Sequence, residues 1–136
     1  MSRAYFDHHI ALLKALHDVC HAGLAPSAQY QHSEARNTAD QEILDTLEVL
    51  VQSSTYDDTF QQQGQWLIDR IVSRYPQFTA HVHRELFWFF GGDCLHYLSD
   101  GELDQFQQMD ELLHDSAYAG KALDYNTARA KVLKLH

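Results

Sequence analysis

The sequence predicts an all-α protein, folded as a single domain over residues 1–136 in an irregular bundle of five to six helices. Apolar residues recur at helical spacing through most of the chain. Only two prolines and six glycines interrupt the 136 residues, and few runs alternate with the period of a strand. A chain of this length buries roughly two-thirds of its unfolded surface, which is enough for a core without disulfides.

The first two helices are expected near the N-terminus. An apolar stripe predicts a helix over residues 3–21, and Gly23 and Pro26 end it. Residues 24–37 are polar and show no clear stripe, so we expect a loop there. A second stripe then predicts a helix over residues 38–53.

The third helix is marked by signals at both ends. Asp57 or Asp58 is the expected N-cap, and Pro76 ends the helix. Gly64 falls inside the apolar stripe of this helix. Because glycine has no side chain, we expect another element to cross the helix closely at that point.

The centre of the fold is predicted between residues 78 and 98, as one helix with a kink or a very short break at Gly91 and Gly92. Residues 87–90 are four consecutive aromatics, Phe-Trp-Phe-Phe. Successive helical residues advance by about 100°, so these rings point to every side of a helix. A solvated helix could not hide all of them, and the segment must therefore be central or face a partner.

Two further helices complete the expected bundle. The sequence from Ser99 to Glu102 has the pattern of a capping box, in which the serine and the glutamate cap each other's backbone. It opens a helix that continues to about Leu113. A last helix is predicted over residues 124–135, with lysines near its C-terminal end.

The aromatic block leads to the first functional hypothesis. One layer of neighbours in so small a chain is expected not to cover an all-round apolar helix, and the glycine pair beside it permits close approach of another backbone. We therefore predict a homodimer with Phe87, Trp88, Phe90, Gly91 and Gly92 at its interface. The leading interpretation is a non-enzymatic interaction or regulatory module with protein partners.

Charge and composition exclude other classes of protein. The formal net charge is −9, from 19 acidic and 10 basic residues, and the basic residues do not cluster. Phosphate backbones and anionic membranes are bound by clustered lysine and arginine, so neither nucleic acid nor a membrane is an expected partner. The sequence has neither a signal-peptide pattern at its N-terminus nor an apolar run of 18 residues. We expect a cytoplasmic protein.

The two cysteines carry little chemical signal. Cys20 and Cys94 each lie in an apolar stretch and show no Cys-x-x-Cys spacing, so we expect buried, reduced thiols. His96 lies close enough in sequence to Cys94 to form a thiolate pair, but the apolar neighbours favour an inert thiol. Common nucleophile and phosphate-binding motifs are absent from the sequence, and we assign no catalytic residue.

Histidine–carboxylate spacing supports an alternative function. Three pairs are spaced by three or four residues, which on a helix lets both side chains reach one metal ion. These pairs are His81 with Glu85, Asp93 with His96, and Glu111 with His114. The two acid-x-x-His pairs resemble in part the ligands of di-iron carboxylate bundles, which also need a lone glutamate from each of two further helices. Glu85 is the candidate for one of these, and Glu42 or Glu48 would have to be the other. The alternative is a metal-dependent helical-bundle enzyme or a metal-binding protein with Fe, Mn or Zn as cofactor.

Histidine–carboxylate pairs at helical spacing also arise by chance, which weakens the metal hypothesis. Ten histidines and 19 acidic residues produce several such pairings on helices without any function. His17 and His21 also lie four residues apart in the first helix. His17 falls near the middle of the apolar stripe, and we expect it to be a buried, neutral histidine of the core. The interaction module is therefore preferred to the metal site.

Overall fold

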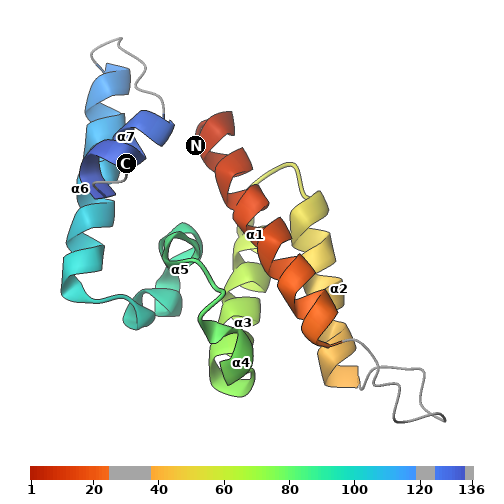
Figure 1. Ribbon diagram of the computed structural model, residues 1–136. Helices are drawn as coiled ribbons and strands as arrows, with labels where there is room; N and C mark the ends of the chain where they lie inside the picture. The colour runs from red at the N-terminus through yellow and green to blue at the C-terminus, as the bar shows by residue number, and fades with distance from the viewer. Residues whose placement is uncertain (25–37, 119–124, 134–136) are drawn as a thin grey trace, which may run out of the picture.

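The computed structural model describes residues 1–24, 38–118 and 125–133, and these residues are folded almost entirely as helices (Figure 1). No strand occurs within these ranges, which confirms the predicted all-α class. None of the helices in the described part of the chain has the length and apolar character that a membrane crossing requires. The loop predicted over residues 24–37 lies, apart from Leu24, outside the described residues.

The N-terminal part is a layer of three helices, α1 (Arg3–Gly23), α2 (Thr38–Gln52) and α3 (Asp58–Arg74). Helices α1 and α2 lie side by side in opposite directions, and α3 packs against α2 (Figure 1). These bounds agree closely with the predicted helices. Asp57 is the N-cap of α3, and its carboxylate accepts the Phe60 backbone N–H at 2.8 Å.

The segment after α3 corrects the prediction of one helix over residues 78–98. It is divided into a short helix α4 (Pro76–Thr79), a helix α5 (Arg84–Phe90) and a 3₁₀-helix η1 (Gly92–Tyr97). The apolar spacing that predicted one helix is retained because each piece turns its apolar side to the same core. Periodicity alone therefore did not reveal the two breaks.

The first break, which was not predicted, precedes α5. His83 has an extended backbone, with φ −62° and ψ 137°, and its Nδ1 accepts the Glu85 backbone N–H at 3.2 Å. The imidazole thus caps the new helix in place of the usual serine, threonine or aspartate. As a result, His81 lies before the start of α5, on a different element from Glu85.

The second break confirms the interruption expected at the glycine pair. Gly91 and Gly92 have φ angles of 65° and 58°, a conformation that side chains other than glycine adopt only with strain. The carbonyl of Phe90, which the break frees, accepts side-chain N–H groups of Gln61 and Gln65 in α3 at 3.1 and 2.9 Å. The end of α5 is therefore fastened to α3.

The C-terminal part comprises α6 (Asp100–Tyr118) and α7 (Tyr125–Leu133), which pack against each other. Helix α6 contacts α5, and α7 lies beside the N-terminal end of α1 (Figure 1). The predicted capping box at the start of α6 is confirmed. Glu102 N–H donates to Ser99 Oγ at 3.2 Å, and Ser99 N–H donates to a Glu102 carboxylate oxygen at 3.0 Å.

Helix α5 packs against α1 and α3, so its aromatic rings fill the core. Phe87, Phe89 and Phe90 are buried within this one chain. The premise that a single chain could not cover these rings is therefore wrong. A Cβ atom added to Gly64 would overlap the ring of Phe90, which confirms the close crossing predicted at that glycine.

Candidate functional site

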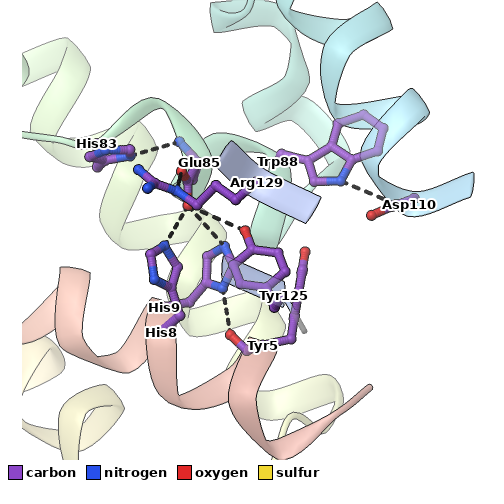
Figure 2. Close-up of polar contacts among 9 residues, drawn as sticks. All are labelled: Tyr5, His8, His9, His83, Glu85, Trp88, Asp110, Tyr125 and Arg129. Carbon is purple, nitrogen blue, oxygen red and sulfur yellow. Dashed lines mark hydrogen bonds and ion pairs between the residues drawn. The ribbon is translucent and has the colours of Figure 1, made fainter. Parts of the chain in front are cut away.

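A buried carboxylate, Glu85, lies where α1, α5 and α7 meet (Figure 2). Glu85 is only 1% exposed. Charged side chains are seldom buried without partners, so this carboxylate must be paired. Glu85 is in the first turn of α5, where the positive end of the helix dipole favours an anion. The partners of this carboxylate come from the two helices nearest the chain ends.

Among the described residues, three side chains hydrogen-bond to Glu85. The Nε–H of Arg129 donates to Oε1, while Tyr125 O–H donates to Oε2 at 3.3 Å and His8 Nε2 lies 2.6 Å from Oε2. Burial acts to raise the pKa of Glu85, but the hydrogen bonds and charges of Arg129 and His8 outweigh it and hold the pKa below its ordinary value. The carboxylate is therefore ionised at neutral pH.

His9 is the second buried polar residue of the cluster, also 1% exposed. Its ring stacks on Phe89, with centroids 4.3 Å apart and planes 10° apart, and its Nδ1 lies 2.7 Å from the Tyr5 carbonyl oxygen. Burial lowers the pKa of His9 to about 4, so the ring is neutral. Since a carbonyl only accepts hydrogen bonds, Nδ1 carries the hydrogen and Nε2 carries a lone pair. That lone pair faces Glu85, with Nε2 4.0 Å from Oε2.

Tyr125 encloses the cluster from the side of α7. Its ring centroid lies 4.8 Å from that of Tyr5, 5.1 Å from that of His8 and 5.7 Å from that of His9. Tyr125 is itself buried. His83 lies at the edge of the cluster, where burial lowers its pKa (Figure 2). The carboxylate is thus surrounded by rings and by one guanidinium.

The three metal-ligating groups of this cluster converge. One donor atom from each of His8, His9 and Glu85 lies within 4.8 Å of the other two. Ligands of a tetrahedral ion with bonds of about 2.0–2.1 Å lie about 3.4 Å apart. To hold one ion, His8 Nε2 must therefore move slightly away from Glu85 Oε2, from which it lies 2.6 Å. His9 Nε2, at 4.0 Å from the same oxygen, must move slightly closer. The hydrogen bond from Nδ1 of His9 to a backbone carbonyl is the arrangement that commonly orients a metal-binding histidine.

Of the six residues named as alternative metal ligands, only Glu85 lies in this cluster. The other five are exposed, and no group of three converging ligands in the described ranges includes them. They are His81, Asp93, His96, Glu111 and His114. The four-residue spacing of His81 and Glu85 does not place them on one helix face, because the helix is broken between them.

The residues predicted for a dimer interface are split between core and surface. Phe87 and Phe90 are buried, whereas Gly91 is partly exposed and Gly92 is exposed. Trp88 is partly exposed, stacks on Phe106 with centroids 5.7 Å apart, and donates its Nε1–H to Asp110 at 3.2 Å (Figure 2). The homodimer stays a prediction, and of the three aromatic residues named for its interface Trp88 alone is partly exposed.

Two further expectations concern single residues. Cys20 and Cys94 are buried and free, as predicted, and burial raises the pKa of each thiol to about 11. His96, the suggested partner of Cys94, is exposed. The expectation of a buried His17 is wrong, because that residue is partly exposed and the buried histidine of α1 is His9.

Sequence reasoning missed four members of the cluster, His8, His9, Tyr125 and Arg129. For His9 a signal was present, since it lies three residues after Phe6 and four before Leu13, on the buried side of α1. A histidine inside an apolar stripe requires a polar partner in the core. No comparable signal marks the residues of α7.

These observations define an all-α protein with a buried histidine–carboxylate cluster between its first, central and last described helices. The chain belongs to the PA2817-like family, whose sequence profile matches residues 1–136. No match was found among curated proteins, and none among solved structures.

Proposed function

We propose that this chain is a metal-binding helical protein that holds one divalent transition-metal ion on His8, His9 and Glu85. The observation that supports the proposal is the convergence of two imidazoles and an ionised carboxylate in a buried position, with the bare Nε2 of His9 turned toward the carboxylate. Two acceptors that face each other at 4.0 Å repel unless a hydrogen or a cation lies between them.

The ligand set indicates the kind of ion. Two neutral imidazoles and one carboxylate form the set that proteins use for catalytic zinc and for non-haem ferrous iron. Magnesium and calcium prefer sites made only of oxygen ligands. We therefore expect Zn²⁺ or Fe²⁺ in preference to Mg²⁺ or Ca²⁺, and Mn²⁺ to bind more weakly than Fe²⁺.

The metal-binding hypothesis takes precedence over the interaction module for a physical reason. The module depended on aromatic rings that one chain could not cover, and Phe87, Phe89 and Phe90 are covered by their own chain. The converging ligands, in contrast, come from α1 and α5, which lie far apart in the sequence. A homodimer and a cytoplasmic location remain predictions from the sequence.

The test is a titration of the tag-free, metal-depleted protein with Co²⁺ and Zn²⁺. Co²⁺ reports its geometry through visible absorption, and Zn²⁺ displaces it from the same ligands. We expect one equivalent of ion per chain and a loss of binding by at least about tenfold in His8→Asn, whose side chain is 20% exposed and therefore tolerates substitution. Glu85→Gln removes the anionic ligand and is expected to abolish the Co²⁺ spectrum.

The matched control is the pair His17→Gln with His21→Gln. These two rings stack on the same helix, with centroids 5.8 Å apart, and they offer two imidazoles outside the cluster. The control variant should bind the ion as tightly as the unchanged chain. The proposal is overturned if the unchanged chain binds no ion, or if binding disappears in the control and persists in both His8→Asn and Glu85→Gln.

A further inference from the structure

Helix α7 packs along α6, and it is joined to α5 through the same carboxylate that the ion would need. Tyr125 and Arg129 are four residues apart, so they lie on one face of α7, and both hydrogen-bond to Glu85. The described buried residues of α7 are Tyr125 and Ala128 alone. The docking of this helix onto α1 and α5 therefore depends strongly on its contacts with the cluster.

We infer that α7 is a regulatory cap whose docking and metal binding oppose each other. The inference rests on the proposed metal site. Arg129 already neutralises Glu85, so a doubly charged ion on the same carboxylate brings two cations together. The lone pairs of Oε2 are also taken by Tyr125 and His8, and an ion must replace at least one of these hydrogen bonds.

Arg129 has two opposite effects on the ion: it orients the Glu85 carboxylate, which favours binding, and it repels a second cation. These two effects differ in size. Removing a residue that orients a metal ligand typically costs about 10–100-fold in affinity. Repulsion between a divalent ion and a guanidinium a few ångströms apart, in a site shielded from water, exceeds that gain. Opposition between α7 and the ion is therefore the expected outcome.

Linkage makes the effect reciprocal. If docked α7 lowers the affinity for the ion by some factor, the ion lowers the docking equilibrium of α7 by the same factor. Any event that pulls α7 away from Glu85 then opens the metal site, and metal binding exposes the face of α7 that carries Tyr125 and Arg129. Couplings of this kind typically lie between about 5- and 150-fold.

The experiment measures Zn²⁺ affinity and amide hydrogen exchange on the tag-free full chain. Arg129→Gln removes the charge but keeps an N–H donor for Glu85, and it should bind Zn²⁺ about tenfold more tightly than the unchanged chain. Lys131→Gln removes the same charge from an exposed position of the same helix and should change the affinity less than twofold. In the unchanged chain, Zn²⁺ should speed exchange of the α7 amides and leave those of α2 unaffected.

The outcomes separate this inference from the proposed function. The inference fails alone if the unchanged chain binds Zn²⁺ but Arg129→Gln binds it equally or less tightly, or if Zn²⁺ protects α7 from exchange. Both fail if no variant binds Zn²⁺. If Arg129→Gln proves too unstable to titrate, the exchange measurement on the unchanged chain decides the sign by itself.

Discussion

Two neighbouring residues of α5 each take part in an arginine–glutamate pair, and the two pairs lie in opposite environments. Arg84 binds Glu102 through two hydrogen bonds of 2.7 and 2.9 Å, with side chains 49% and 26% exposed. Glu85 binds Arg129 with side chains 1% and 23% exposed. The first pair joins α5 to α6 on the surface, and the second joins α5 to α7 in the interior.

The comparison shows that burial, more than geometry, decides what such a pair does. The hydrogen bond from Arg84 lowers the pKa of Glu102 to about 2, yet water can replace Arg84 at little cost. Water cannot replace Arg129 so easily, because the carboxylate of Glu85 is buried and lies among aromatic and imidazole rings. Of these two pairs, the buried one is therefore the one that can couple the docking of a distant helix to the binding of an ion.

The largest expected difference is in stability. Arg129→Met should lower the free energy of unfolding by about 3 kcal/mol, the lower end for a broken buried pair, because His8 and Tyr125 still hydrogen-bond to the carboxylate. Arg84→Met should cost about 1 kcal/mol or less. Urea unfolding of the metal-free protein at pH 7 measures both. Equal losses in the two variants would show that Glu85 is better solvated than its burial implies.

The next largest effect is a pH dependence of the free energy of unfolding, which comes from the histidines beside Glu85. The pKa of His9 is lowered by burial to about 4, whereas in the unfolded chain it is about 6.5. Unfolding therefore takes up a proton between these values, and the free energy of unfolding falls as the pH falls. The part due to His9 amounts to about 2 kcal/mol between pH 7 and pH 5. His83, whose pKa is also lowered, adds a smaller contribution of the same sign.

The variant His9→Gln tests this assignment, since glutamine keeps an N–H donor for the Tyr5 carbonyl but does not titrate. Its stability should fall by about 2 kcal/mol less than that of the unchanged chain over the same pH range. His17→Gln, on the partly exposed side of α1, should retain the full pH dependence. An unchanged slope in His9→Gln would place the proton uptake elsewhere.

The helices and their ends were predictable because their signals are local. The Asp57 cap and the capping box of Ser99 with Glu102 each depend on residues a few positions apart, and both are confirmed. The crossing at Gly64, also confirmed, was indicated by the place of that glycine in its own apolar stripe, although the ring that it admits, Phe90, is distant in sequence. The break before α5 escaped prediction because its cap is His83, a residue type that is seldom an N-cap. One unusual cap was enough to separate His81 from Glu85.

The site was predictable only in one member, Glu85, and for a reason that proved wrong. Its expected partner was four residues away, whereas its actual partners His8 and Arg129 lie 77 and 44 residues away along the chain. Helical spacing carries no information at such separations, since they depend on how whole helices pack. The buried stripe of α1 did contain a clue in His9, because an imidazole inside an apolar stripe indicates a polar site within the core.

The smallest effect expected is the response of the exposed pair to salt. A double-mutant cycle of Arg84→Met and Glu102→Gln isolates the pairing energy, since glutamine at position 102 can still cap Ser99. At 1 M NaCl the Debye length is about 3 Å, so a coupling of about 0.5 kcal/mol at low salt should fall close to zero. The cost of Arg129→Met should change little, because salt ions do not reach Glu85. If salt reduced both quantities alike, solvent would have access to the carboxylate, and the contrast between the buried pair and the exposed pair would fail with it.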